Sequence, residues 1–484
     1  MAARDRKSSD GSSPKRRPGP RGLKRAVRLS PSAIPAVAGM RVGETRREDG
    51  LRSASNPATK RAMNDHPRGR HLVAADRRFA TGGGLFAHLL SGSFSRILDR
   101  IDRGLERGAI EATLPDGSTR LLGGRGAGPR PVVRLHSWRS LARLINSGSV
   151  GWYKAWEKGE WSSPDPVPLF ELFMLNAESL GATARAKGLF RLVNSVAHRF
   201  RDNDKARARE NISHHYDLGN DFYRAWLDSG MTYSSAVFAE AVPAGEPLEA
   251  AQDRKLHLLL DRLGLKPGQK LLDIGCGWGS LAEAAARDYG VEVTGLTLSE
   301  EQKAYAERRL EAAGLAGRCS IELTDYRDSR GDYDAVASVE MVEAVGQAYW
   351  PAYLDTVARL LKPGGRAAIQ FISIREPLFD DYAANADFIQ TYIFPGGMLV
   401  SESRLEALAS AAGLSWQDRR GYGLHYAETL KRWRARYDSA VEEGRLPSGF
   451  DERFHRLWRY YLMYCEGGFR GAGIDVAQVT LVKR

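Results

Sequence analysis

The chain has 484 residues, with 71 lysines and arginines against 59 aspartates and glutamates. This length accommodates about two domains plus terminal segments. Three cysteines without C-x-x-C spacing indicate neither a disulfide framework nor a zinc site. The sequence has no run of about 18 apolar residues, which would indicate a membrane span, and it shows no signal-peptide pattern. A cytoplasmic location is therefore expected, with any membrane contact peripheral.

The net charge is concentrated at the N-terminus. The first 70 residues contain 18 Lys and Arg against 6 Asp and Glu, an excess equal to the +12 of the whole chain. A segment this rich in Ser, Pro, Gly and Arg buries too little apolar surface to fold. Residues 1–78 are therefore expected to form a disordered basic leader. The alternative is a polybasic arm attracted to anionic lipid headgroups or, with less support, to nucleic acid.

The first folded region is expected to begin at Phe79 and to form a small α+β domain over residues 79–165. Its predicted elements are a helix from 85, β-like segments at 109–114 and 131–135 with the turn Pro115-Asp116-Gly117 between them, and a helix at 137–147. Residues 166–210 are predicted to form a basic helical linker. A solvated helix face and a phospholipid-facing surface both account for its charge.

From residue 211 to the C-terminus, strand-like and helical patterns alternate as in α/β units. The predicted strands are 270–274, 291–297, 320–323, 333–338 and 366–372. The predicted helices are 281–289, 300–313 and 349–361. Lys362-Pro-Gly-Gly365 is predicted to turn the chain into the fifth strand. Residues 475–482 are predicted to add an antiparallel strand.

The run Lys270-Leu-Leu-Asp-Ile-Gly-Cys-Gly-Trp-Gly-Ser280 is the most informative motif. Asp273 ends the first predicted strand, and Gly275, Gly277 and Gly279 follow it. Glycine lets the backbone turn sharply and lets a ligand approach main-chain N–H groups. Doubly wound sheets place nucleotide sites at such loops. The motif resembles the S-adenosylmethionine (SAM) site of class I methyltransferases, which implies their doubly wound, seven-stranded α/β sheet.

The ends of the next two strands carry further candidate ligands for SAM. An acidic residue often binds the ribose hydroxyls after the second strand. Here Thr297 and Gln302 would bind them as neutral hydrogen-bonding groups. Ser299 is expected to cap the following helix. After the third strand, Asp325 and Tyr326 are expected to meet the adenine amine and ring face.

Several motifs in one order point to a family. They are His215-Tyr-Asp-Leu-Gly-Asn-Asp221, Tyr233-Ser234, Leu272-Asp-Ile-Gly-Cys-Gly-Trp-Gly279, Glu343-Ala-Val-Gly346 and Tyr392-Ile-Phe-Pro-Gly-Gly397. With them the chain resembles the cyclopropane-fatty-acyl-phospholipid synthase family from about Phe79 to the C-terminus. The resemblance implies that residues 79–165 form the family's small lipid-associating domain and that the enzyme works at the inner face of the membrane. Such an enzyme transfers the methyl carbon of SAM to the double bond of unsaturated phospholipid acyl chains, giving cyclopropane chains.

The resemblance also implies roles for individual residues. The positions that match SAM contacts are Tyr233, Ser234, Gly275, Gly277, Thr297, Leu298, Gln302 and Tyr326. Those that match a bicarbonate site beside the reacting carbon are Ser235, Glu343, Gln370, Ile372 and Tyr426. Ser235 stands where the family usually has cysteine, and Gln370 replaces a histidine. These two departures put the strength of bicarbonate binding, and the product, in question.

The chemistry sets requirements of its own. An isolated double bond is a weak nucleophile, so catalysis should consist mainly of holding it, dry, against the sulfonium methyl. The resulting carbocation favours an apolar, aromatic pocket. Candidate lining residues are Phe222, Tyr233, Phe238, Phe371, Tyr392 and Phe394, each with core packing as the alternative. Ring closure then needs a base. Glu343 and Tyr426 would position bicarbonate, and Gln370 would donate its amide to it.

Other functions stay open at this stage. The same cofactor and lipid would give a methyl- or methylene-branched chain if a different proton were lost, and a partner reductase would finish it. A SAM enzyme acting on a soluble metabolite and a lipid carrier are further alternatives. Nucleic-acid binding is disfavoured, because the chain beyond the leader has balanced charge. Acyl chain length, double-bond position, headgroup preference and oligomeric state, a homodimer included, are not readable from the sequence.

Overall fold

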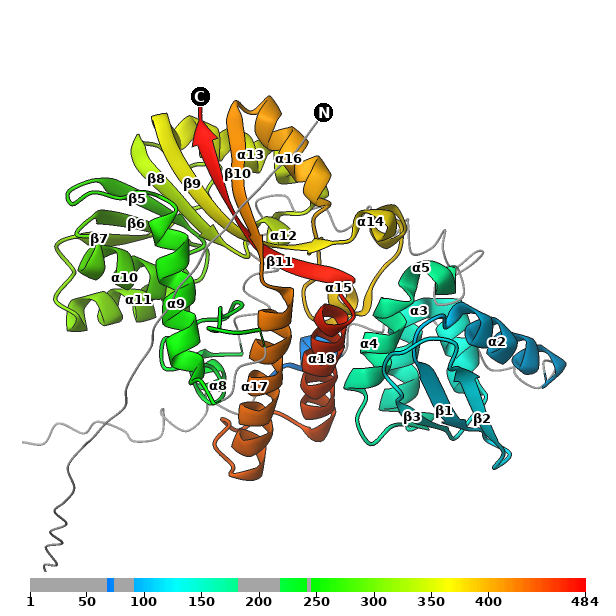
Figure 1. Cartoon of the computed structure of the whole chain (residues 1–484). Coiled ribbons are helices and arrows are strands. Elements are labelled where there is room, and N and C mark those ends of the chain that lie inside the picture. The colour runs from blue at the N-terminus through cyan, green and yellow to red at the C-terminus, as the bar shows by residue number, and fades with distance from the viewer. Residues whose placement is uncertain (1–67, 74–90, 182–217, 242–244) are drawn as a thin grey trace, which may run out of the picture. The chain divides into compact units, whose positions relative to one another are not determined.

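The computed structural model describes residues 68–73, 91–181, 218–241 and 245–484, which all fall within one compact unit spanning residues 63–484 (Figure 1). Most of the predicted leader lies outside the described residues. Its end does not, because α1 (Arg70–Val73) places Leu72 and Val73 at 3% and 6% exposure in the hydrophobic core. Residues 68–73, at the end of the predicted leader, are therefore part of the folded unit.

The N-terminal region contains a four-stranded sheet in the order β2-β1-β3-β4. Its elements are α2 (Ser91–Gly104), β1 (Ala109–Thr113), β2 (Thr119–Gly123), β3 (Val132–Leu135), α3 (Arg139–Glu157) and β4 (Trp161–Ser162). The two predicted strands are present, and the predicted turn closes a β1–β2 hairpin that the sequence pattern did not reveal. Helix α3 runs ten residues beyond its predicted end, because it continues through a kink at Gly148.

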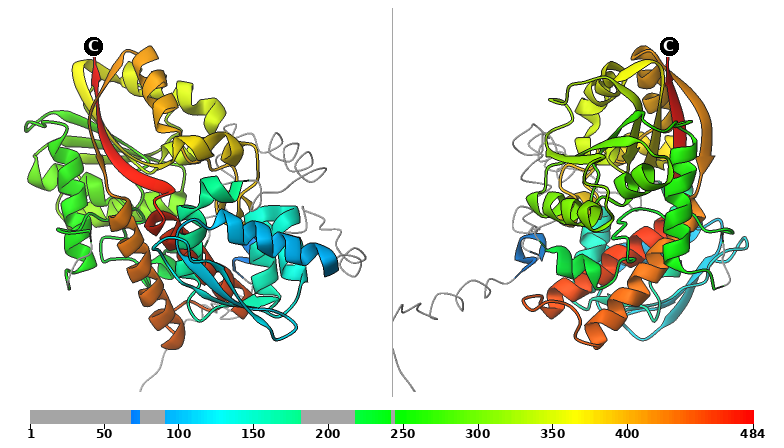
Figure 2. Two further views of the ribbon diagram at one scale, coloured as in Figure 1. Left: turned by 45° about the vertical axis from the view of Figure 1, so that its right-hand side comes forward. Right: turned by 90° about the vertical axis from the view of Figure 1, so that its left-hand side faces the viewer.

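Two short helices follow, α4 (Val167–Leu175) and α5 (Ala177–Leu180). The basic side chains of the predicted linker begin at Arg185 and lie outside the described residues. Helix α4 packs on the C-terminal helix α18 (Glu452–Arg470), where the Phe170 and Tyr460 rings meet edge to face at 5.2 Å. Helix α17 (Gly423–Glu442) lies beside α18 (Figures 1 and 2).

The second sheet has seven strands among the described residues, in the order β10-β11-β9-β8-β5-β6-β7. They are β5 (Lys270–Ile274), β6 (Glu292–Thr297), β7 (Cys319–Leu323), β8 (Tyr333–Val339), β9 (Leu361–Ile374), β10 (Leu414–Gly421) and β11 (Ile474–Lys483). Strands β5 to β9 pair in parallel, and β11 is antiparallel to both of its neighbours. This confirms the predicted doubly wound α/β sheet and its antiparallel last strand.

The remaining helices of this region lie before β5 and between the strands, and the longer ones form because their apolar residues recur at helical spacing. They are α8 (Asn220–Arg224), α9 (Leu248–Asp261), α10 (Ser280–Asp288), α11 (Glu300–Ala312), α12 (Val342–Val345), α13 (Trp350–Leu360), α14 (Glu376–Ala383), α15 (Phe388–Tyr392) and α16 (Glu402–Ala411). The expected turn at 362–365 is instead part of β9, whose pairing with β8 shifts register there. None of the described helices combines the length and apolar character needed to cross a bilayer.

Candidate active site

A cavity of about 380 Å³ lies at the carboxyl ends of β5, β6 and β8, where the strand order changes direction. Among its lining residues are ten of those predicted to bind SAM: Tyr233, Ser234, Asp273, Gly275, Gly277, Thr297, Leu298, Gln302, Asp325 and Tyr326. Three of the residues predicted to hold an anion, Glu343, Ile372 and Tyr426, line it too. The other three predicted residues, Gly279, Ser235 and Gln370, do not line the cavity.

The glycines of the loop after β5 serve different purposes. Gly275, Gly277 and Gly279 have φ angles of 83°, 54° and 85°, which favour glycine. A Cβ on Gly277 would meet nothing within 4 Å, so this backbone faces open cavity. A Cβ on Gly279 would lie 3.0 Å from that of Ala306, and one on Gly275 3.3 Å from Met341 Sδ. Gly277 thus leaves room for a ligand, whereas Gly279 lets α11 pack closely.

Asp273 lies in β5, two residues before Gly275, and is 2% exposed. Burial raises its pKa to about 7, against the opposing effect of the nearby Lys255 ammonium. Its Oδ2 atom has no hydrogen-bond partner among the described residues. A buried acceptor at the wall of a cavity needs a donor from elsewhere. The amino and hydroxyl groups of SAM are donors of the right kind.

At the end of β6, neutral side chains form a short network. The Thr297 hydroxyl donates to Gln302 Oε1 at 2.8 Å and accepts from the Ser299 amide at 3.1 Å. Ser299 Oγ accepts from the Gln302 amide at 3.2 Å, which confirms the predicted cap of α11. Thr297 and Gln302 therefore face the cavity as one unit, in the place where the sequence predicts contacts to ribose.

After the end of β7, the Asp325 carboxylate is held by Arg327, two residues further along the chain. Its carboxylate pairs with the Arg327 guanidinium at 2.7 Å and accepts from the Arg327 amide at 3.0 Å. Tyr326, 5% exposed, lines the cavity, and its hydroxyl has no partner among the described residues. Burial raises the Tyr326 pKa to about 12, so the phenol stays neutral. It can donate to an acceptor on a ligand.

The segment before α9 closes the other side of the cavity. The hydroxyls of Tyr233 and Tyr461 lie 2.9 Å apart, and Ser234 Oγ accepts from Lys255 Nζ at 2.6 Å. Lys255 has no solvent exposure, and burial lowers its pKa to about 8. The Trp278 indole donates to Asn220 Oδ1 at 2.7 Å, which links the described end of the predicted 215–221 motif to the glycine loop; residues 215–217 lie outside the described residues. These residues together fit SAM.

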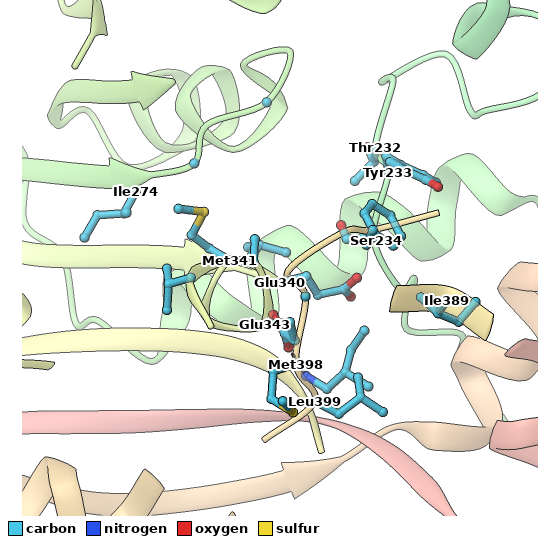
Figure 3. Close-up of a pocket in the computed structure, with 18 of the residues that line it drawn as sticks. Thr232, Tyr233, Ser234, Ile274, Glu340, Met341, Glu343, Ile389, Met398 and Leu399 are labelled. Atoms are coloured by element: carbon cyan, nitrogen blue, oxygen red, sulfur yellow. Dashed lines mark hydrogen bonds between the residues drawn. The ribbon is translucent and has the colours of Figure 1, made fainter. Parts of the chain in front are cut away.

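Glu340, at the end of β8, is a candidate functional residue that the sequence analysis missed. It lines the cavity (Figure 3). Its Oε1 accepts from the Ser235 amide and from Gln370 Nε2, both at 2.8 Å, and its Oε2 accepts from the Tyr426 hydroxyl at 2.7 Å. Its φ of 50° is unusual for a residue with a side chain. An acidic residue directly after the fourth strand was the available signal.

Glu343 lies next to Glu340 at the start of α12 (Figure 3). Its Oε1 accepts from the Ile372 amide, and its Oε2 has no hydrogen-bond partner among the described residues. Burial, assisted by the Glu340 charge, raises its pKa to about 8. Burial also raises the Glu340 pKa, but three hydrogen bonds and the Lys255 charge act in the opposite direction. Of the two, Glu340 is the better stabilised as an anion.

These contacts do not fit the bicarbonate ion that the sequence resemblance implies. The structure does bring the five predicted groups together. However, Ser235, Gln370 and Tyr426 all donate to Glu340, and the Ile372 amide donates to Glu343. The donors expected to hold an added anion are thus satisfied by carboxylates of the chain itself.

Beyond the two glutamates the cavity wall is largely apolar and includes Ile389, Met398 and Leu399 (Figure 3). Phe394 and Phe469 also line the cavity, as do the polar residues Asp387 and Gln390. Two of the predicted aromatic lining residues, Tyr233 and Phe394, are present in the wall. The other four pack in the core instead and do not line the cavity: Phe222, Phe238, Phe371 and Tyr392.

One cavity segment is anchored to the N-terminal region. Asp387 caps α15, and its Oδ1 accepts from Ser149 Oγ at 2.7 Å and from the Tyr464 hydroxyl at 2.8 Å. The Phe388 amide in turn donates to Ser149 Oγ at 3.1 Å. Ser149 follows the kink of α3, so that helix positions a wall of the apolar end.

Comparisons with known proteins agree with this geometry. The family model for mycolic acid cyclopropane synthetase matches residues 203–479. The tuberculostearic acid methyltransferase UfaA1 of Mycobacterium tuberculosis is 40% identical, over 74% of this chain and 84% of its own length. The cyclopropane-fatty-acyl-phospholipid synthase of Escherichia coli K12 is 35% identical, over 72% and 87%. A crystal structure of mycolic acid cyclopropane synthase CmaA1 with SAH and CTAB has a TM-score of 0.53 at 31% identity, covering 57% of this chain and 98% of its own.

Proposed function

The chain belongs to the mycolic acid cyclopropane synthetase family of SAM-dependent methyltransferases, and we propose that it methylates the double bond of unsaturated acyl chains in membrane phospholipids. The observation that carries this proposal is the composition of one cavity. Its polar end has the features of a SAM site, and its other end is walled by apolar side chains. The two glutamates stand where these ends meet.

The residues divide the work between them. SAM, when bound, supplies an electrophilic methyl group. The loop around Gly277 leaves space for it, and Asp273 and Tyr326 offer hydrogen-bonding groups that are unpartnered within the described residues. The apolar walls hold the acyl chain and exclude water, which would otherwise capture the carbocation that methylation leaves on the chain. A carboxylate at the junction stabilises that cation and accepts its proton.

Two products are compatible with this first step. Loss of a proton from the new methyl group with ring closure gives a cyclopropane, the product expected from the sequence. A hydride shift to the cationic carbon, followed by loss of a methyl proton, gives a methylene branch, which a partner reductase would convert to a methyl branch. We favour the branched product, because the relative named for tuberculostearic acid is 40% identical and the cyclopropane synthase of E. coli 35%.

The test is to express the full chain in a bacterial host that lacks this activity. The fatty acids of its phospholipids are then examined by mass spectrometry and NMR. We expect monounsaturated chains to gain one CH₂, with vinylidene proton signals for a methylene branch or upfield ring-proton signals for a cyclopropane. Unchanged lipids in cells whose purified protein binds SAH would refute the lipid substrate. Methylation of a soluble compound would then support the alternative.

Location at the inner face of the membrane belongs to the same proposal. A phospholipid substrate requires the enzyme to meet the bilayer, and the basic residues of the leader would favour an anionic surface. Flotation with vesicles of dioleoyl phosphatidylglycerol, compared with dioleoyl phosphatidylcholine, tests this. Equal binding to both would exclude an electrostatic contribution.

A further inference from the structure

The hydrogen bonds around Glu340 match those of a site built for an anion. Three donors from three separate segments reach its carboxylate: the Ser235 amide, the Gln370 side chain and the Tyr426 hydroxyl. Hydrogen bonds to the charged form of a carboxylate favour that form. The carboxylate nevertheless borders the cavity, on the boundary between its polar and apolar ends. Its three donors therefore favour the anion against the burial that raises its pKa, and it is close to where an acyl chain would lie.

The charges around Glu340 disfavour the binding of an added anion such as bicarbonate. Glu340 and Glu343 already adjoin each other, and the nearby buried cation, Lys255, donates to Ser234. A bicarbonate ion would add a further negative charge to a site of low dielectric, where like charges cannot all remain ionised. It would also have to displace Glu340 from its donors.

The backbone conformation of Glu340 is also unusual. Glu340 has a φ of 50°, in the left-handed region where glycine is favoured. A residue with a side chain in this region costs of order 1 kcal/mol, and such strain collects at functional sites. In this backbone conformation the Glu340 side chain reaches its three donors. Glycine at 340 would relieve the strain and leave the donors free.

We propose that Glu340 is the general base of the reaction and replaces bicarbonate as the anion beside the reacting carbon. This inference rests on the proposed function for its substrate. One oxygen of the Glu340 carboxylate takes a proton from the methyl carbon of the acyl cation. The electron pair of that C–H bond forms the new bond that closes the ring or makes the methylene double bond. Ser235, Gln370 and Tyr426 are positioning residues that hold the carboxylate.

The first experiment measures binding and not turnover. Equilibrium dialysis of the full chain with radiolabelled bicarbonate, in the presence of saturating SAH, compares wild type with Glu340→Gly. We expect no stoichiometric bicarbonate on wild type and one equivalent on the glycine variant. Stoichiometric bicarbonate on wild type would overturn the proposal, as would its absence from a glycine variant that still binds SAH. Neither result depends on the lipid substrate, so this arm stands apart from the test of the proposed function.

The second experiment uses turnover with labelled SAM and vesicles of unsaturated phosphatidylglycerol. In buffer freed of carbon dioxide, wild type should keep its rate within about twofold. Glu340→Gly and Glu340→Gln should each lose roughly 10²–10⁴-fold, the usual contribution of a general base. Bicarbonate should restore the glycine variant but not the glutamine variant, whose amide still fills the site. A bicarbonate-dependent wild type, or an active glutamine variant, would refute the proposal.

Ala472 offers a control for the change in backbone conformation. It is also a residue other than glycine with a left-handed φ, of 51°, but it is exposed and does not line the cavity. Ala472→Gly should keep the wild-type rate and bind no bicarbonate. A bicarbonate effect in this variant would show that the effect in Glu340→Gly arises from general changes in the protein.

Discussion

The side-chain amide of Gln370 donates to Glu340 at 2.8 Å, and two further hydrogen bonds fix the orientation of that amide. Arg262 Nε donates to Gln478 Oε1 at 3.2 Å, and Gln478 Nε2 donates to Gln370 Oε1 at 3.0 Å. Because arginine can only donate, the oxygen of Gln478 must face Arg262 and its nitrogen must face Gln370. The oxygen of Gln370 then faces Gln478, and its nitrogen faces Glu340. The relay begins near the surface and ends at the candidate base.

Breaking this series of hydrogen bonds should make the Glu340 anion less stable. Gln370→Leu removes one of three donors to the Glu340 carboxylate, so the anion is less stabilised and its pKa rises. The acidic limb of the pH–kcat profile should therefore move upward by about 1 unit, which corresponds to one hydrogen bond to a charged group. Gln417→Leu, on the exposed part of β10, is the control. An unshifted limb, with normal SAH binding, would mean that Gln370 only fills space.

The glycine loop makes a separate prediction about cofactor binding. Gly277→Val should abolish SAH binding in calorimetry, because its side chain would enter the open space in front of the loop. Gly268→Val is the matched control, with a φ of 80°, open space around it and a place outside the cavity. Both variants carry a similar backbone strain of about 1–2 kcal/mol. Only the first should lose the ligand, and normal binding by it would mean that the loop does not hold SAM.

Glu343 should make the protein less stable as the pH rises. Its pKa is about 8 in the folded state, against 4.5 as the ordinary value, so the folded protein binds more protons between these values. The free energy of unfolding then falls as pH increases across that window. Glu343→Gln keeps the acceptor for the Ile372 amide and removes the titration.

Urea unfolding of wild type and Glu343→Gln at pH 5 and pH 8.5 measures this effect. The stability of wild type relative to the variant should decrease between the two pH values by about 2–4 kcal/mol, allowing for partial access from the cavity. A constant difference would show that Glu343 is ionised throughout. Asp273 titrates in both proteins, so its contribution cancels.

The contact between Ser149 and Asp387 should influence the lipid more than SAM. Ser149→Ala removes the donor to Asp387 and the acceptor for the Phe388 amide, at a cost of about 1–2 kcal/mol in stability. Because these residues position one apolar wall, KM for phospholipid should rise while SAH affinity stays within about twofold. Loss of SAH affinity of the same size would contradict this division of the cavity.

Much of the sheet could be predicted from the sequence, because buried parallel strands appear as short apolar runs bounded by turn residues. Strand β5 was placed correctly to the residue, and the helix after the glycine loop, α10, begins one residue before its predicted start. Strand β10 was missed, since its exposed, charged sequence resembles a loop and only pairing with β11 makes it a strand. Helix α3 extends beyond its prediction, because packing holds it together across the kink at Gly148.

The sequence by itself determined the family, the glycine loop after β5 and a set of the polar residues that line the cavity, because motif spacing within one strand–turn–helix unit is a local property. Only the tertiary structure decided what Ser235, Gln370 and Tyr426 bind. These residues are far apart in the chain and come together through sheet pairing and the packing of α17. Which acceptor they share depends on distances that no local pattern contains, and that acceptor is Glu340.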